Sequence, residues 1–280
     1  MFYKSTNPTP DTTSSRTYNR SHNRAYAQQR PKQKEMIFGL HAVIEAIDAG
    51  KTLDKVLIRR DMSSALARQL LDRLQANQAL ASTQVQRVPV ERLNQFTDKN
   101  HQGVIAFLSP IEFYSVEEVV TEVFERGETP LIMVLDGVTD VRNFGAIART
   151  ASCAGAHALV ISTKGSAAIT GDAVKTSAGA LHTLPVCKTD SLAQTLQYLK
   201  EAGLTLVAAT EHTDLLYTQT DMTRPLAIVM GNEEKGIYEK NLEICDVKVR
   251  IPMAGTIESL NVSVAAGIMM YEALRQRNNG

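Results

Sequence analysis

Residues 131–150 read LIMVLDGVTDVRNFGAIART, and this stretch decides the fold. Its first five residues are apolar and suit a fully buried strand. A polar loop follows Asp136 and Gly137, and we expect a helix to begin near Gly145. A strand that leads into a helix and then into another strand is the unit from which parallel sheets are built. The stretch therefore predicts an α/β fold.

The same alternation of strands and helices continues towards the C-terminus. The expected strands are residues 131–135, 158–161, 204–209, 226–230 and 247–251. With helices between them, these strands predict a mainly parallel sheet that is covered on both faces. In such sheets, ligands bind beyond the carboxyl ends of the strands. No Gly-x-Gly-x-x-Gly sequence follows any of these strands, which disfavours a nicotinamide dinucleotide as the ligand.

The sequence before residue 131 divides into three parts. Residues 36–110 predict a small α/β domain, with helices at 39–47, 63–75 and 90–96 and strands at 55–58, 84–88 and 103–108. Residues 111–130 form a linker with an expected helix at 115–125. Residues 1–35 carry seven Lys and Arg against two acidic residues, so we expect a disordered basic tail. This tail is either only solvated or an arm that folds onto RNA phosphates.

Composition excludes several classes of protein. The 280 residues are 44% hydrophobic with a formal net charge of zero, which is ordinary for a globular protein. No apolar run reaches the ~18 residues of a membrane span, and the N-terminus lacks the apolar core of a signal peptide. Cys153, Cys187 and Cys245 form no CxxC pair, so we expect reduced, packed thiols. We therefore expect a soluble, cytoplasmic protein with neither a membrane nor a metal partner.

The first of three loops at expected strand ends lies within residues 135–150. It contains Asn143, whose amide suits ligand binding, and Arg149, which we place on the first turns of the following helix. The N-terminus of that helix offers free N–H groups to an anion. A structural interpretation stays open, in which Asn143 only caps the helix and Arg149 faces water.

The second and third loops follow the strands that end near residues 230 and 251. The second lies in IVMGNEEKGI, residues 228–237, where Gly231 permits close approach of a ligand or another backbone. Glu233 and Glu234 follow it, although acids there also suit a helix N-terminus. The third lies in IPMAGTIESLNVSVAAGIMMYE, residues 251–272, where Ser259 or Asn261 alternatively serves only as a helix cap.

Taken in this order, the three loops resemble the three motifs of the SpoU (TrmH-type) branch of the SPOUT RNA methyltransferases. The resemblance covers residues 131–277. The helix at Gly39–Ala46 and the tetrapeptide His101–Val104 resemble, more weakly, the ribosomal-protein-like RNA-recognition domain of that family. The whole layout is most similar to bacterial 23S rRNA guanosine 2′-O-methyltransferases.

The resemblance implies a trefoil-knotted catalytic domain at residues 131–280, an RNA-recognition domain at 36–110 and S-adenosylmethionine as cofactor. It implies a cofactor pocket lined by Gly231, Ile251 and Leu260, with Thr210, Met230, Met253 and Ala265 as less certain members. It also implies that the conserved polar set consists of Asn143, Arg149, Glu233, Ser259 and Asn261. The segment at residues 175–180 is similar to a further family loop whose role is less defined.

Methyl transfer from a sulfonium is an in-line displacement, for which the protein supplies position and electrostatics. A guanidinium normally stays protonated, so we expect Arg149 to hold the target phosphate and to stabilise the developing alkoxide. The base is Glu233, the phosphate or a water, and the sequence leaves this open. We expect Asn143 and Asn261 to orient the loop and the nucleotide, and no metal to take part.

The partner implied by the resemblance is RNA. The separate N-terminal domain favours rRNA, and ribose methylation of tRNA is the second hypothesis. A non-catalytic RNA-binding or ribosome-assembly factor is the third, although the combined presence of Asn143, Arg149, Glu233 and Asn261 argues against it. The small residues 265–267, followed by Met269, Met270 and Leu274, predict more apolar helix surface than one sheet layer covers. We therefore expect a homodimer, as the family resemblance also implies.

Overall fold

The computed structural model of the protein describes residues 36–76, 83–256 and 259–279. The expected basic tail, residues 1–35, lies outside the described residues. Two sheets organise the described chain, one formed before residue 110 and one after it. Within the described ranges, no helix is long and apolar enough to cross a bilayer.

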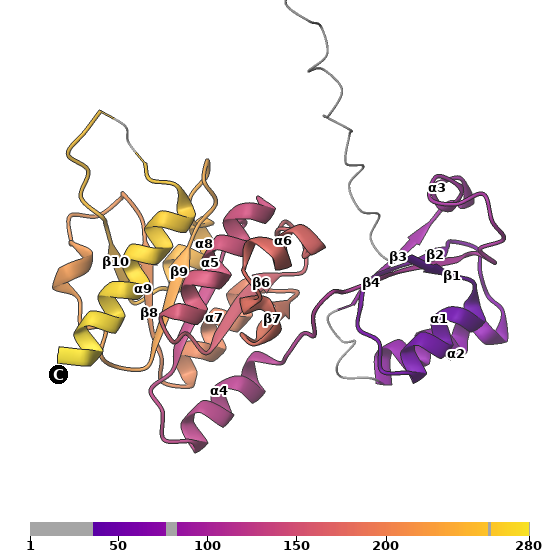
Figure 1. The fold of residues 1–280 in the computed structure, drawn as a ribbon, viewed down its shortest axis with the longest axis horizontal. Coiled ribbons are helices and arrows are strands. Elements are labelled where there is room, and N and C mark those ends of the chain that lie inside the picture. The colour runs from indigo at the N-terminus through magenta and orange to yellow at the C-terminus, as the bar shows by residue number, and fades with distance from the viewer. Residues whose placement is uncertain (1–35, 77–82, 257–258, 280) are drawn as a thin grey trace, which may run out of the picture. The chain divides into compact units, whose positions relative to one another are not determined.

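The N-terminal half is a four-stranded sheet that carries helices on both faces (Figure 1). Its strands, in the spatial order β1-β4-β2-β3, are β1 (Met36–Phe38), β2 (Leu53–Arg59), β3 (Gln84–Val88) and β4 (Val104–Leu108). Helices α1 (Leu40–Asp48) and α2 (Ala65–Ala76) cover one face, and α3 (Val90–Asn94) contributes to the core on the other. The helices and strands expected between residues 39 and 108 are all present, within two residues of their expected bounds.

The C-terminal half contains a six-stranded sheet in which all neighbouring strands are parallel. In the spatial order β10-β8-β9-β5-β6-β7, its strands are β5 (Leu131–Leu135), β6 (Ala158–Ser162), β7 (Val186–Thr189), β8 (Thr205–Ala209), β9 (Leu226–Met230) and β10 (Val247–Val249). The α/β class and the mainly parallel sheet predicted from the sequence are confirmed. Strands β1 and β7 were not expected, because three or four residues are too few to show a periodic pattern.

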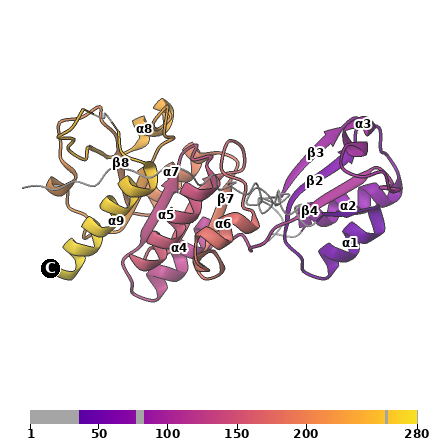
Figure 2. The ribbon, with the colours of Figure 1, turned by 45° about the horizontal axis from the view of Figure 1, so that its top comes forward.

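Helices cover this sheet on both faces. They are α4 (Val116–Glu125), α5 (Val141–Cys153), α6 (Gly171–Thr176), α7 (Leu192–Glu201), α8 (Glu239–Ile244) and α9 (Val262–Asn279). Apolar residues of α4 and α7 pack with one face of the sheet, joined by partly buried residues of α8. Those of α5, α6 and α9 pack with the other face (Figure 2). The helix expected in the linker is α4, and it belongs to the core of this sheet.

Helix α9 lies directly beside α5. A Cβ built on Gly267 would lie 3.6 Å from Thr150 Cγ2 of α5, so this small residue lets the helices approach closely. Met269 and Met270 are fully buried within the same chain. The expectation that these two methionines exceed what one chain covers is therefore wrong, because the sheet and α5 already enclose them.

The apolar side chains that α9 does expose are fewer than the sequence predicted. Val264 is 51% exposed and Tyr271 is 49% exposed. They are seven residues apart, which places them on the same side of the helix. This pair, rather than the methionines, is the exposed large apolar surface of α9.

Two of the three cysteines are packed, as expected. Cys187 and Cys245 are buried, and burial raises the pKa of each thiol to about 12. Cys153 is exposed, so the expectation of a packed thiol is wrong at this position. It lies four residues after the exposed Arg149 on α5, on the side of that helix that faces away from the sheet.

Arg277 anchors the last turns of α9 to the opposite end of the sheet from the strand carboxyl ends. Its guanidinium donates hydrogen bonds to four backbone carbonyls, those of Thr129, Pro130, Met222 and Arg224, at 2.9–3.2 Å. Burial lowers the pKa of this guanidinium. The loops that begin β5 and β9 are thereby tied to the C-terminal helix.

We expect Arg277→Met to lower the free energy of unfolding by about 2–4 kcal/mol, because hydrogen bonds to a charged donor are lost at carbonyls that are partly buried. Met keeps the apolar stem, so the loss reports on the guanidinium. Urea unfolding measures it, and Arg224→Met is the matched control, since that side chain is 76% exposed and its ion pair with Asp221 lies at the surface. Equal stability of the two variants would contradict this anchoring role.

Candidate active site

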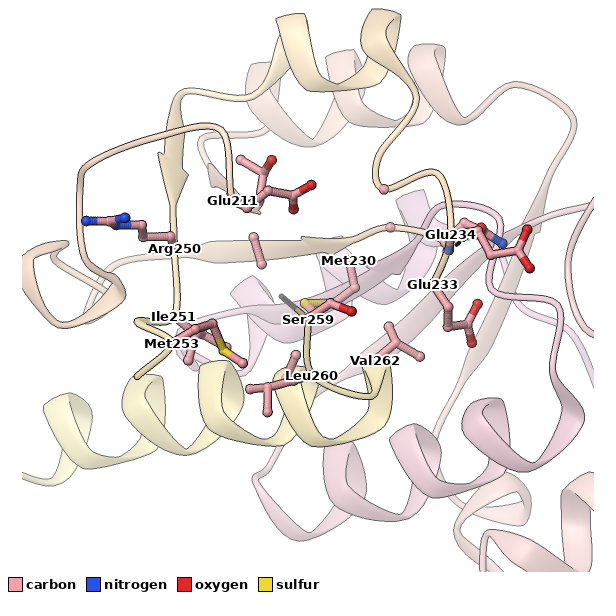
Figure 3. A pocket seen from close by; sticks show the side chains of 16 residues that line it. Glu211, Met230, Glu233, Glu234, Arg250, Ile251, Met253, Ser259, Leu260 and Val262 are labelled. Atoms are coloured by element: carbon pink, nitrogen blue, oxygen red, sulfur yellow. Dashed lines mark hydrogen bonds between the residues drawn. The ribbon is translucent and has the colours of Figure 1, made fainter. Parts of the chain in front are cut away.

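A cavity of about 280 Å³ opens at the carboxyl ends of β8, β9 and β10 (Figure 3). It lies where the topology of a parallel sheet places ligands. Four segments build it: the end of β8, the loop after β9, the chain between β10 and α9, and the start of α9 itself. The residues that line it are Ala209, Thr210, Glu211, Met230, Gly231, Asn232, Glu233, Glu234, Gly236, Arg250, Ile251, Met253, Ser259, Leu260, Val262 and Ala265.

All seven residues predicted for the cofactor pocket line this one cavity. They are Thr210, Met230, Gly231, Ile251, Met253, Leu260 and Ala265. They come from positions up to 55 residues apart, and the parallel strand ends bring them together. Figure 3 shows Ile251, Met253 and Leu260 gathered on one side of the cavity. Of the predicted polar set, Glu233 and Ser259 also line it.

The loop after β9 folds back tightly on itself. Asn232 N donates to Gly236 O, and Gly236 N donates to Asn232 O, both at 2.9 Å. The Asn232 side chain holds the loop from inside, because its Oδ1 accepts from Glu234 N and Lys235 N. Its Nδ2 also donates to Gly137 O in the loop after β5, at 2.8 Å. Asn232 therefore fixes the loop that carries Glu233, a role the sequence analysis missed.

Position 231 must be glycine because the backbone of this loop packs against it, not because a ligand needs the space. A Cβ built on it would lie 2.6 Å from Gly236 O and closer still to Gly236 C and Ile237 N. The sequence allowed Gly231 to admit either a ligand or another backbone, and the structure places the backbone of residues 236–237 there. A side chain at this position must therefore displace the loop.

We expect Gly231→Ala to weaken binding of S-adenosylmethionine about tenfold or more, because overpacking by even one carbon shifts the loop that forms the cavity wall. Isothermal titration calorimetry measures the affinity, with thermal unfolding to confirm that the variant is folded. Gly171→Ala is the matched control, since a Cβ there would meet nothing within 4 Å. Unchanged affinity in a folded Gly231→Ala variant would show that the loop does not shape the binding cavity.

At the mouth of the cavity, side chains from all three loops join. Asn143 Nδ2 donates to Glu233 Oε1 at 2.7 Å. Asn261 Nδ2 donates to Asn143 Oδ1 at 3.0 Å. The structure thus brings three of the five predicted polar residues into direct contact, from positions 143, 233 and 261 of the chain.

The structural alternatives left open for these residues have clear outcomes. Asp140 caps α5, since its Oδ1 accepts from the backbone N–H of Arg142 and of Asn143, each at 2.8 Å. The helix begins at Val141, four residues earlier than expected, and the Asn143 side chain is free for the contacts described above. The N–H groups expected to bind an anion are partly occupied by this cap. Asn261 does cap α9, because Ser263 N donates to its Oδ1 at 2.9 Å, and its Nδ2 still reaches Asn143.

Arg149 does not line the cavity. It is exposed in the third turn of α5, not in the first turns as expected, because the helix begins earlier. Its guanidinium forms no salt bridge within the described ranges. An exposed guanidinium six residues after Asn143 is suited to meet a phosphate from solvent rather than a molecule inside the cavity.

The chemistry of the lining fits S-adenosylmethionine. Met230, Ile251 and Leu260 offer apolar surface for a flat heterocycle, and the small Gly231 and Ala265 leave room beside it. Three carboxylates, those of Glu211, Glu233 and Glu234, also line the cavity, which suits a positively charged sulfonium. Arg250 does not neutralise them at the centre, because Figure 3 shows its side chain pointing away from the cavity. No group of three His, Cys, Asp or Glu within the described part of the chain is arranged to hold a metal.

Comparison with known proteins gives matches along nearly the whole described chain. The model of the SpoU rRNA Methylase family matches residues 130–271, and a model for RNA 2′-O ribose methyltransferase substrate binding matches residues 36–114. The 23S rRNA (guanosine-2′-O-)-methyltransferase RlmB of Pseudomonas putida is 38% identical over 252 residues, covering 88% of this chain and 98% of that protein. A Bacillus subtilis protein named for the TrmH family of tRNA/rRNA methyltransferases is 34% identical over 247 residues, with 88% and 98% covered. The crystal structure of the SpoU methyltransferase AviRb from Streptomyces viridochromogenes, in complex with AdoMet, superposes with a TM-score of 0.55 at 28% identity, covering 88% of this chain and 91% of that one.

Proposed function

This chain belongs to the SpoU rRNA methylase family, and on that premise we propose that it methylates the ribose 2′-hydroxyl of a guanosine in 23S rRNA. It is an S-adenosylmethionine-dependent RNA 2′-O-methyltransferase. The choice of 23S rRNA and of guanosine is supported by the P. putida relative. The choice of the ribose is supported by the substrate-binding model that matches residues 36–114.

The observation that carries the proposal is the contact among Glu233, Asn143 and Asn261 at the mouth of the cavity. Through Glu233, this contact joins the cavity to the loop after β5 and to the start of α9. Glu233 lines the cavity, and Asn143 occupies its Oε1. Among the described residues, no hydrogen bond to Glu233 Oε2 is present, so that oxygen is available to a hydroxyl group.

S-adenosylmethionine, when bound, supplies a methyl group on a positively charged sulfur. Glu233 would accept the proton of the ribose 2′-hydroxyl through its Oε2 as that oxygen takes up the methyl group. The proton would end on the Glu233 carboxylate. Asn143 holds Glu233, and Ser259 lies beside the reacting groups.

Arg149 binds the phosphate of the target nucleotide from the exposed side of α5. Its charge stabilises the oxygen as negative charge develops there. Asn261 keeps the loop before α9 against Asn143. The residues that hold the cofactor are Thr210, Met230, Gly231, Ile251, Met253, Leu260 and Ala265.

The proposal assigns a task to each part of the chain. Residues 131–280 form the methyltransferase domain, residues 36–110 recognise the RNA with a ribosomal-protein-like fold, and residues 111–130 link them. The basic tail, residues 1–35, adds contacts to RNA phosphates. The protein works in the cytoplasm, where it meets its RNA substrate.

The methyltransferase domain contains a trefoil knot, in which α9 threads through a loop of its own chain. In support, α9 follows the edge strand β10 yet packs beside α5 and β9, in the middle of the sheet.

The domain pairs with a second copy as a homodimer, and exposed Val264 and Tyr271 on α9 support an interface there. In an isologous pair, Arg149 of one subunit serves the cavity of the other.

For the homodimer, we expect that mixing two inactive variants, Arg149→Ala and Gly231→Val, recovers activity under conditions that exchange subunits. Each mixed dimer then holds one intact cavity and one intact Arg149, which together make one complete site. The recovered rate is measured as methyl incorporation into RNA, with each variant alone as the control. A protein that is monomeric by light scattering at micromolar concentration and fully active there contradicts the homodimer.

A tRNA substrate is the second candidate, and the name of the B. subtilis relative supports it. Mapping of 2′-O-methyl groups in total RNA from cells with and without the gene tests both candidates. We expect one guanosine of 23S rRNA to lose its methyl group when the gene is absent. Loss of a tRNA methyl group instead would overturn the choice of rRNA, and an unchanged RNA would overturn both.

A further inference from the structure

The contact between Glu233 and Asn143 is one step of a longer series of hydrogen bonds. We call the series Glu233, Asn143, Asn261 and Ser263 the amide relay. Asn143 Nδ2 donates to Glu233 Oε1 at 2.7 Å, and Asn261 Nδ2 donates to Asn143 Oδ1 at 3.0 Å. At the far end, Asn261 Oδ1 accepts from Ser263 N at 2.9 Å and from Ser263 Oγ at 2.5 Å. The relay therefore runs from the start of α9 to the mouth of the cavity.

The direction of these bonds is fixed at one end. A backbone N–H can only donate, so the N–H of Ser263 requires the oxygen of the Asn261 amide to face it. The Asn261 NH₂ group must then point outwards, to Asn143 Oδ1. Because Asn143 Oδ1 faces Asn261, the NH₂ group of Asn143 faces Glu233. Each amide has one accepting and one donating end, so the whole relay has a single polarity.

We propose that Asn261 is a positioning residue: the backbone N–H of Ser263 fixes the orientation of its amide, and Asn261 in turn orients the amide of Asn143. The NH₂ group of Asn143 then faces Glu233, and it can bond only to an oxygen that accepts. This inference rests on the proposed role of Glu233 as proton acceptor. The relay holds Oε1 as an acceptor and leaves Oε2 for the ribose hydroxyl. Ser263 is half-buried in the first turn of α9, does not line the cavity, and acts through Asn261 and Asn143.

Neighbouring groups do not supply the same restraint. Asn232 holds the loop backbone at Glu234 and Lys235, but within the described residues it makes no hydrogen bond to the Glu233 carboxylate. Asp140 binds the backbone of Asn143 and leaves its side chain free to turn. In the part of the chain that the structure describes, the orientation of the Asn143 amide thus depends on Asn261.

The first test compares Asn261→Asp with Asn261→Ser. Both replacement side chains still cap α9, because each has an oxygen that accepts from Ser263 N. The aspartate carboxylate has no donor and makes the Asn143 amide turn its NH₂ group away from Glu233, whereas the serine hydroxyl is too short to reach that amide. We expect Asn261→Asp to lose about 100-fold in rate of methyl transfer and Asn261→Ser about tenfold. Side-chain packing alone predicts the reverse order, since Asp is isosteric with Asn, so the reverse order overturns the proposal.

The second test is a double-mutant cycle that needs no RNA. Asn143→Asp places a carboxylate next to the exposed Glu233, so we expect a small but measurable drop in the midpoint of thermal unfolding. In the Glu233→Gln background, the glutamine amide turns and donates to the new carboxylate at position 143, and the drop should shrink by at least about half. Additive effects of the two substitutions overturn the relay. If the cycle shows coupling but the protein does not methylate RNA, the relay stands and the proposed function fails.

Discussion

Glu233→Gln is expected to lower the rate of methyl transfer by about 10³-fold while the protein stays folded and binds S-adenosylmethionine. The two side chains have nearly the same shape, and the glutamine still offers an oxygen to Asn143 Nδ2, which lies 2.7 Å from Glu233 Oε1. The amide cannot take up the proton of a 2′-hydroxyl group. The loss in rate therefore reports on proton acceptance by Glu233, because the loop keeps its position in the variant.

Single-turnover assays with excess enzyme measure this rate, and calorimetry measures the affinity for the cofactor. Glu239→Gln is the matched control, since Glu239 begins α8 and does not line the cavity. A Glu233→Gln variant with near-normal turnover would mean that the phosphate or a water takes the proton. The proposed role of Glu233 would then be wrong.

Arg149→Ala is the second substitution from which we expect a large effect, a loss of about 10²–10³-fold in methyl transfer. Arg149 is exposed on α5 and does not line the cavity, so the affinity for S-adenosylmethionine should stay unchanged. Lys at this position keeps the charge but not the planar fork that binds a phosphate through two hydrogen bonds. We therefore expect Arg149→Lys to fall between the wild type and Arg149→Ala.

The control for Arg149 is Arg224→Ala, an exposed arginine in the segment that leads into β9, at the other end of the sheet. It should methylate RNA at the wild-type rate. If Arg149→Ala retains activity within about threefold of Arg224→Ala, the phosphate-binding role is wrong. If it instead loses cofactor affinity, Arg149 belongs to the cavity and its placement on the RNA side is wrong.

The parts of the fold that the sequence predicted are those with long, regular patterns. The apolar runs of β5 and β9 and the helical periodicity of α1 and α2 each span enough residues to identify the element. The seven residues expected around the cofactor were named from the resemblance, because the motifs keep a fixed order at the strand ends. Their convergence in one cavity is a property of the sheet, whose carboxyl ends all lie at one edge.

Other features depended on contacts between distant residues and were not predictable. Asp140 and Asn143 are both good helix caps, and only the structure shows that Asp140 takes this role. No pattern in the sequence pointed to Asn232, yet its amide joins the loops after β5 and β9 across 95 residues. Ser263 gave no signal at all, because its role depends on the orientation of two other side chains.

The burial of α9 shows a further limit of prediction from the sequence alone. Met269 and Met270 gave a correct indication of an apolar helix, but the sequence did not show that the chain itself covers them. Whether an apolar helix face meets its own sheet or a partner depends on where the helix packs. The position of α9 beside α5 decides this, and Gly267 is the local reason the two helices come so close.

Methyl transfer to a ribose oxygen of RNA at the joined loops is tested most directly with purified protein, S-adenosylmethionine and unmodified 23S rRNA transcript. The RNA is digested to nucleosides, and the product is identified by mass spectrometry. We expect 2′-O-methylguanosine, about one per transcript, and none when the Glu233→Gln variant replaces the wild type at equal time. A methyl group on a base, or no methylated nucleoside from protein that binds the cofactor, would contradict it.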